Sequence, residues 1–388
     1  MDVIHAEVYR KDYSEPLMAE GWPLMEGIAI KDVLVAWRVL AALGRSLQNR
    51  LSVETSSPVR EKLYAASPII SLHSLEDILH RPLRHLSTKA NRKLLQSFPW
   101  DGSTPDDADL WYRPLIQLGD DRVIALAEPL VGLNLERVID KAASDRNFFD
   151  KKGKHFESKF RADIAAIAAT ASSRIAKVRT ASIGRLRTSR DKCGDIDLII
   201  KVGQTLLVGE VKCLRFPAIS REFYNNLDQL RKGCRQAARK AKAVSACLDE
   251  VFLQTGFEPG SDDAQWKVLP IVVSNQAIGV GTSFEGVPIV DRQILDSYLG
   301  HGGYYPFAQL ANNGTVWDKG CFISYFADSV EAEDKLEEYL RKPSAISRLE
   351  PFFKTRRTLI AQSGEPFYVE SLELGLVQLN KTIPAYLP

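Results

Sequence analysis

Three charged residues stand at the ends of two short apolar segments near the middle of this 388-residue chain. Residues 194–213 read GDIDLIIKVGQTLLVGEVKC, in which Asp197 precedes one apolar run while Glu210 and Lys212 close the next. Carboxylate oxygens are ligands that Mg²⁺ accepts. Such an ion polarises a phosphate and lowers the pKa of a bound water, and a nearby ammonium orients that water or stabilises developing charge. These residue types therefore fit metal-dependent phosphodiester hydrolysis, with Lys212 in the ammonium role.

The two apolar segments predict strands that are joined by a turn at residues 202–204. Side chains alternate between the faces of a strand, so Asp195 and Asp197 share one face, as do Glu210 and Lys212. If the strands pair as a hairpin, Asp197 comes close to Glu210 and Lys212 at one end of a sheet. For Asp195 the pattern favours a carboxylate in a turn over a metal ligand.

This arrangement resembles a known superfamily. Asp197 and, thirteen positions later, the triplet Glu210-Val211-Lys212 resemble the PD-(D/E)xK restriction-endonuclease-like nucleases, especially their Mrr-like and Holliday-junction-resolvase-like branches. The resemblance covers about residues 150–300. It implies that Asp197, Glu210 and Lys212 are catalytic and that the carboxylates bind Mg²⁺, for which Mn²⁺ can substitute. The proline that gives the motif its name is absent, because Ile196 precedes Asp197, and an apolar strand ending in ExK also occurs by chance in unrelated proteins.

Further residues follow from the same resemblance. These families place a glutamate on the helix before the sheet, and the matching position is Glu157 in KGKHFESKF, as a catalytic residue and metal ligand. A surface glutamate is the alternative for Glu157. Some relatives carry a glutamine on the helix after the lysine, and Gln229 and Gln236 are both candidates for that nucleic-acid-binding position.

The charge of the chain is unevenly distributed. Residues 151–250 contain 22 Lys+Arg against 10 Asp+Glu, a net of +12, whereas the whole chain carries +2 and the rest therefore carries −10. Such a basic block is typical of a surface that binds the phosphate backbone, although a solvated charged face gives the same count. Arg185, Arg187 and Arg190 lead directly into the strand of Asp197, and we interpret them as a nucleic-acid-binding track. An exposed strand edge guarded by charges is the alternative.

The central segment predicts an α/β fold, a restriction-endonuclease-like core with a mixed central sheet flanked by helices. Its helices are expected at residues 155–171 and 220–248, and its strands at 174–186, 196–201, 205–213 and 268–274. Apolar residues at helical spacing also predict a helix at residues 28–48. We expect three regions: a mainly helical accessory domain for recognition or regulation (1–145), the nuclease domain (146–300) and an α+β extension (301–388).

Composition excludes several classes of protein. With 45% hydrophobic and 26% charged residues, the chain has the composition of an ordinary globular protein and no apolar run suited to a bilayer, so we expect no membrane partner. No apolar run follows the first residues as a signal peptide requires, and the five cysteines form no CxxC pair. A cytoplasmic location without a zinc site is therefore expected.

We thus expect a metal-dependent nuclease that acts on nucleic acid, with double-stranded DNA as the default substrate. The large accessory region suggests bacterial defence against foreign DNA with a partner protein of that system, by analogy alone. A homodimer or higher homo-oligomer is expected because double-strand cuts need two sites. Two alternatives stay open: a catalytically inactive nucleic-acid-binding protein that retains the fold, and an RNA-directed nuclease.

Overall fold

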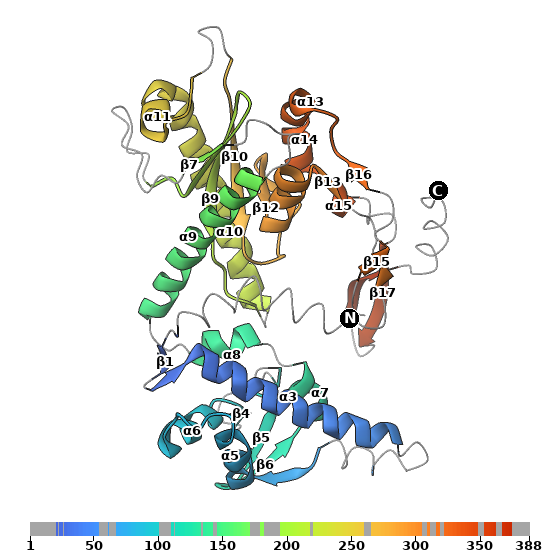
Figure 1. The fold of residues 1–388 in the computed structure, drawn as a ribbon. Coiled ribbons are helices and arrows are strands. Elements are labelled where there is room, and N and C mark those ends of the chain that lie inside the picture. Colours follow the sequence, from blue (N-terminus) through green and yellow to red (C-terminus); the bar gives the residue numbers. More distant parts are fainter. Residues whose placement is uncertain are drawn as a thin grey trace. The chain divides into compact units, whose positions relative to one another are not determined.

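The computed structural model in Figure 1 describes most of the chain in two compact units. The described residues are 21, 23–25, 27–53, 61, 67–100, 110–111, 113–132, 135–142, 146–170, 179–181, 195–217, 220–259, 265–304, 309–310, 316–318, 322–347, 353–361 and 367–374. The first unit comprises residues 1–152 with 215–220, and the second comprises residues 153–214 with 221–388. The predicted boundary before residue 146 coincides with the start of helix α9 (Arg146–Thr170), whose first residues belong to the first unit.

The first unit combines helices with a four-stranded sheet. Its long helix α3 (Ile30–Val53) buries an apolar stripe that includes Val33, Leu40 and Leu47, as the spacing predicts. The sheet has the order β3 (Ile69–Ser71), β6 (Arg122–Ala125), β5 (Leu115–Leu118), β4 (Pro99–Trp100). Four further helices are α5 (Leu72–His80), α6 (Thr88–Leu95), α7 (Ala127–Val131) and α8 (Leu135–Ala142). The expected mainly helical region therefore also contains a four-stranded sheet.

The second unit contains a six-stranded mixed sheet. The strand order is β11 (Ser283–Phe284), β12 (Val287–Val290), β10 (Lys267–Ser274), β9 (Thr205–Lys212), β8 (Leu198–Val202), β7 (Arg179–Ala181). Strands β7, β8 and β9 pair antiparallel, whereas β9, β10 and β12 run parallel. Helix α10 (Ser220–Ala246) lies between β9 and β10 in sequence, as a parallel connection requires. The expected α/β class with a mixed sheet is confirmed.

Two apolar layers cover the faces of this sheet. Leu198, Ile200 and Leu207 pack in one cluster with Phe160 and Ile164 of α9. Their neighbours point to the opposite face, where Ile199, Leu206 and Val208 pack with Ala241 and Val244 of α10. Helix α11 (Leu248–Thr255) adds Val251 and Phe252 to this second layer. Figure 1 shows α9 and α10 beside the sheet, and the two layers explain why β8 and β9 carry apolar residues on both faces.

The segment after residue 300 contributes to the same core. Helix α12 (Arg292–Leu295) continues into the π-helical turn η4 (Asp296–His301), which spans the expected boundary between residues 300 and 301. Tyr298 of η4 is fully buried, and its hydroxyl donates to the carbonyl oxygen of Ala332 at 2.8 Å. Helices α13 (Ser329–Asp334) and α14 (Leu336–Arg341) add Leu336 and Tyr339 to the cluster around Phe160.

The remaining described elements of the second unit are three strand pairs and one short helix. They are the strand pairs β13 (Gly303–Tyr304) with β16 (Ile323–Ser324), β14 (Gln309–Leu310) with β15 (Val316–Asp318), and β17 (Phe353–Ala361) with β18 (Phe367–Leu374), together with helix α15 (Ser344–Ser347). In the part of the chain that the structure describes, no helix is both long and apolar enough to cross a bilayer.

Candidate active site

The candidate site lies at one end of the β8–β9 hairpin. The two strands pair antiparallel with Leu198 opposite Gly209, and continuing this register by one residue sets Asp197 opposite Glu210. Gly203, with a positive φ of 58°, allows the tight turn between Val202 and Thr205 that fixes the register. The predicted hairpin is confirmed. Because opposite residues of an antiparallel pair share a face, Asp197 and Glu210 point to the same side of the sheet.

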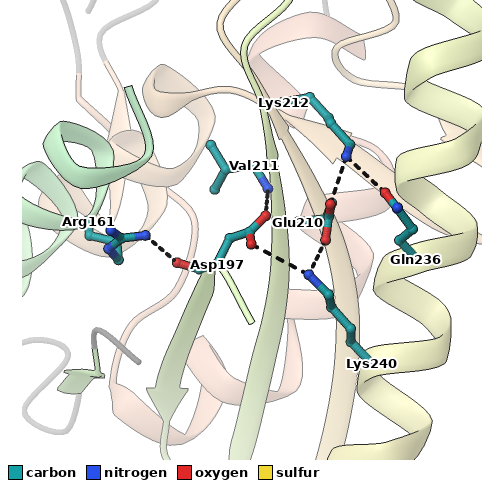
Figure 2. A network of polar contacts seen from close by, with 7 residues as sticks. All are labelled: Arg161, Asp197, Glu210, Val211, Lys212, Gln236 and Lys240. Atoms are coloured by element: carbon teal, nitrogen blue, oxygen red, sulfur yellow. Dashed lines mark hydrogen bonds and ion pairs between the residues drawn. The ribbon is translucent and has the colours of Figure 1, made fainter. Parts of the chain in front are cut away.

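Asp197 is held at the start of β8 through both its backbone and its side chain (Figure 2). Its Oδ2 accepts a hydrogen bond from the backbone N–H of Val211 at 2.9 Å, and its backbone oxygen accepts one from Arg161 of α9 at 3.1 Å. Burial raises the pKa of the Asp197 carboxyl, and the negative charge of Glu210 raises it further, whereas Lys240 and the Val211 N–H lower it. The charged form of Asp197 is therefore desolvated, which favours a bound cation.

Glu210 and Lys212 occupy alternate positions of β9 and face α10. The side chain of Glu210 is 7% exposed, and its Oε1 accepts a hydrogen bond from the Lys212 ammonium at 2.7 Å. The same ammonium donates to Oε1 of Gln236 on α10 at 2.8 Å. The structure thus brings Asp197, Glu210 and Lys212 together, as the strand pattern predicted.

Gln236 is the glutamine that reaches this cluster. The sequence left Gln229 and Gln236 as alternatives for the helix position. Gln229 is exposed, whereas Gln236 is partly buried and contacts Lys212 (Figure 2). The step of seven positions from Gln229 to Gln236 corresponds to nearly two helical turns, so both lie on one side of α10 but at different heights along it.

Lys240 also reaches the site, and the sequence reasoning missed it. Its ammonium contacts Oε2 of Glu210 and lies 3.5 Å from Oδ1 of Asp197. The whole residue is 6% exposed. A signal was present, because Lys240 is three residues after the buried Ala237 and four after Gln236, which places a lysine in the buried stripe of the helix.

Glu157 lies within electrostatic reach of the cluster. It is on α9 and partly buried. Burial raises the pKa of its carboxyl, and the charge of Asp197 raises it further, as does that of Glu210 to a smaller degree. Arg161 and Lys212 lower it. The helix glutamate implied by the resemblance is therefore close enough to interact electrostatically with both strand carboxylates.

The carboxylates of this cluster are the side chains that could hold a divalent ion. Among the residues that the structure describes, no three His, Cys, Asp or Glu side chains converge tightly enough to hold a metal by themselves. Asp197 and Glu210 nevertheless supply carboxylate oxygens from neighbouring strands. Mg²⁺ at phosphate-processing sites is commonly held by one or two carboxylates, with waters and substrate phosphate completing its shell. The two carboxylates fit that requirement in number and chemistry, and Glu157, whose pKa both of them raise, is a candidate for a third ligand.

The predicted nucleic-acid-binding track cannot be placed in the structure. Arg185, Arg187 and Arg190 lie outside the described residues. Helix α10 contributes an exposed basic surface instead, formed by Arg231, Lys232, Arg235, Arg239 and Lys242. Lys232 and Arg239 are four residues before and three after Gln236, so they lie on the same side of α10 as this site residue.

Comparisons with family models, with curated proteins and with solved structures found no match for this chain. The positions and chemistry of Asp197, Glu210, Lys212 and Gln236 are therefore the basis on which a function can be proposed. Together they offer two hard anionic ligands and one oriented ammonium at the end of a sheet.

Proposed function

We propose that this protein is a metal-dependent nuclease that hydrolyses phosphodiester bonds of nucleic acid, with double-stranded DNA as its substrate. The observation that supports this most directly is the meeting of Asp197 and Glu210 on one face of a hairpin, with the Lys212 ammonium 2.7 Å from Glu210. Charged residues are almost never buried in a sheet unless they are paired. A cluster of them at a strand end is a candidate for chemistry, because buried charges that perturb one another's pKa values are typical of active sites.

The element order favours the restriction-endonuclease-like core as the fold of this domain. A helix (α9), three antiparallel strands (β7, β8, β9), a second helix (α10) and a parallel strand (β10) follow one another along the chain. The motif residues fall where the resemblance requires them: Asp197 before β8, and Glu210 with Lys212 at the end of β9. Both the order and the positions support membership of the superfamily.

In the proposed reaction each residue has a distinct task. Asp197 and Glu210 would hold Mg²⁺, or Mn²⁺ in its place, and the bound ion would supply Lewis acidity toward the phosphate and acidify a water. Lys212 is placed by Glu210 and Gln236, so its ammonium is ready to orient the attacking water or to stabilise charge on the phosphate. Arg161 fixes the backbone at Asp197 and so positions the start of β8.

The basic surface of α10 is the proposed path for the phosphate backbone. Arg235 and Arg239 are exposed and lie on either side of Gln236 along the helix. Neutralising phosphates with such side chains releases condensed counterions and favours binding without reading sequence. Arg185, Arg187 and Arg190 remain part of the proposal, since they precede the Asp197 strand in the sequence.

A second candidate function is supported by the ion pairs themselves. Lys240 of α10 contacts both Asp197 and Glu210, so these ion pairs also tie α10 to the sheet. A nucleic-acid-binding domain that keeps these ion pairs for structure and does not cleave would have the same contacts. The two candidates differ in one property, metal-dependent cleavage, since both bind nucleic acid.

The decisive experiment is incubation of the full-length protein with plasmid DNA, linear duplex, single-stranded DNA and RNA, each in Mn²⁺, Mg²⁺ or EDTA. If the protein is a nuclease, we expect cleavage in Mn²⁺ or Mg²⁺ and no cleavage in EDTA. Glu210→Gln should not cleave with or without metal. Asp334→Asn is a matched control, because it alters an exposed carboxylate on α13. Binding of labelled DNA without cleavage in any metal would favour the second candidate.

Size-exclusion chromatography of the same protein tests the expected homodimer. A dimer with two sites should convert plasmid directly to linear product, whereas a monomer should first accumulate nicked circles. A location in the cytoplasm and a partner protein from a bacterial defence system complete the proposal.

A further inference from the structure

A lysine that the proposed catalytic set does not use lies inside the site. Only 8% of the Lys240 side chain is exposed, and its ammonium contacts both the Glu210 and Asp197 carboxylates. Buried lysines are rare unless their charge is paired. The pairing here is with the two residues proposed to hold the metal ion, so Lys240 is placed where it affects that ion directly.

The four oxygens of these carboxylates all have a donor. Oδ2 of Asp197 accepts from the Val211 N–H and Oε1 of Glu210 accepts from the Lys212 ammonium, at 2.9 and 2.7 Å respectively. The two remaining oxygens, Oδ1 of Asp197 and Oε2 of Glu210, both face Lys240. Figure 2 shows this ammonium bridging the pair. Asp197 and Glu210 are also the two carboxylates that would hold a metal ion.

We propose that Lys240 is a resident cation of the site. Its ammonium neutralises Asp197 and Glu210 in the metal-free protein, and a divalent ion must displace this ammonium to bind both carboxylates. The inference rests on the metal-dependent function proposed above. Two carboxylates and two ammonium groups, those of Lys212 and Lys240, sum to zero charge. A doubly charged ion gains little from a neutral site, whereas departure of Lys240 leaves a net charge of −1 that attracts the ion.

The side-chain chemistry of lysine suits this role. An ammonium and a divalent ion cannot share the same two oxygens, because their repulsion is strong where water is largely excluded. Lysine carries its charge on a flexible four-carbon stem, so the ammonium of Lys240 can leave while α10 stays in place. Substrate phosphates would give it a new anionic partner. Metal binding would then be favoured by substrate, since both draw Lys240 away from Glu210.

The first experiment measures Mn²⁺ affinity without substrate, by isothermal titration calorimetry on wild type, Lys240→Met and Lys240→Arg. Methionine keeps the length of the side chain and removes the charge, whereas arginine keeps the charge. If the paired arrangement fills nine-tenths or more of the metal-free molecules, Lys240→Met should bind Mn²⁺ about tenfold more tightly or better. Lys240→Arg should remain within about threefold of wild type.

The second experiment needs no change at Lys240, so it decides the question even if Lys240→Met fails to fold. Lysine acylation by a water-soluble acetylating reagent is followed by mass spectrometry in EDTA and in Mn²⁺. Lys240 should be protected in EDTA and become labelled in Mn²⁺, while the exposed Lys242 is labelled equally in both. Asp197→Asn should abolish the difference, because it removes one of the two proposed ligands.

The outcomes separate the inference from the function on which it rests. Tighter binding by Lys240→Met, or metal-dependent labelling of Lys240 in wild type, supports the resident cation. Equal Mn²⁺ affinity of wild type and Lys240→Met, with unchanged labelling, overturns the inference and leaves the metal site intact. Absence of Mn²⁺ binding by wild type and by Lys240→Met at millimolar concentration overturns both the inference and the proposed metal dependence.

Discussion

Lys212 of β9 and Gln236 of α10 are joined by a hydrogen bond of 2.8 Å, although 24 positions separate them in the chain. The ammonium of Lys212 also donates to Glu210 at 2.7 Å. Two acceptors fix the direction of a long and flexible side chain better than one. One acceptor is on its own strand and the other is on a helix, so the packing of α10 against the sheet controls where the ammonium points.

We expect Gln236→Ala to reduce cleavage by about 10–100-fold, the range for residues that orient the members of a metal site. The loss should appear in kcat, because the amide orients Lys212 and is not proposed to bind the metal. Gln229→Ala is the matched control, since Gln229 is exposed on the same helix. Steady-state kinetics on a short duplex measure both variants. An equal loss in the two would mean that α10 contributes surface contacts alone.

Asp197→Asn, Glu210→Gln and Lys212→Ala should each reduce cleavage at least about a hundredfold, because each removes one component of a single assembly. Single-turnover cleavage in Mn²⁺ measures the loss, and circular dichroism checks that the variants remain folded. Glu157→Gln should also impair cleavage, by less. Activity within about twofold of wild type for any of the first three would remove that residue from the catalytic set.

The Gly233→Ala variant tests whether the position of Lys212 affects cleavage independently of the stability of the fold. An added Cβ would lie 3.1 Å from Cε and 3.4 Å from Cγ of Lys212, so the lysine stem must shift. Alanine favours a helix by about 1 kcal/mol over glycine, and we expect an unchanged or higher Tm. Cleavage should fall by about 10–100-fold, since small displacements of reacting groups are costly.

Gly153→Ala is the control for this change. Gly153 also lies in a helix, α9, but an added Cβ there would meet no atom within 4 Å. Gly153→Ala should raise the Tm of the protein without reducing the rate of cleavage. If Gly233→Ala cleaves as fast as Gly153→Ala, the position of the Lys212 ammonium does not limit the reaction.

Removal of two exposed arginines of α10 should flatten the salt dependence of DNA binding. With Glu210→Gln as the background to prevent cleavage, Arg235→Ala/Arg239→Ala should reduce the slope of log K against log salt by roughly 2, one for each lost phosphate contact. Fluorescence anisotropy at several salt concentrations measures it. Arg84→Ala/Lys89→Ala alters two exposed basic residues of the first unit and should leave the slope unchanged. Equal slopes for both pairs of substitutions would mean that the basic surface of α10 is a solvated charged face that does not contact DNA.

Leu336→Ala tests whether α14 belongs to the core of the second unit. Leu336 is fully buried in the cluster that contains Phe160 and Tyr298, so truncation should lower the free energy of unfolding by about 2–5 kcal/mol. Urea denaturation followed by circular dichroism measures the change. Val330→Ala, at a position 68% exposed, should change it by less than about 0.5 kcal/mol. A loss below about 1 kcal/mol for Leu336→Ala would contradict a shared core.

Local sequence was sufficient for the hairpin and for three of its charged residues. The alternation of side chains along a strand and the short turn at Gly203 are local properties, so the strand pattern alone places Asp197, Glu210 and Lys212 on one face. The long helices α3 and α10 were predictable for the same reason, since their apolar stripes repeat at helical spacing.

Other features depend on tertiary packing. The choice of Gln236 over Gln229 and the position of Lys240 between two carboxylates follow from how α10 lies across the sheet, which spacing within one helix cannot fix. The core shared by Tyr298 and Leu336 likewise joins segments far apart in the chain. The order of residues along the chain establishes which groups could do the chemistry and on which strands they stand. The packing of α10 on the sheet determines that Lys240 faces Asp197 and Glu210. This position depends on contacts between elements and not on the spacing of side chains within one helix or strand.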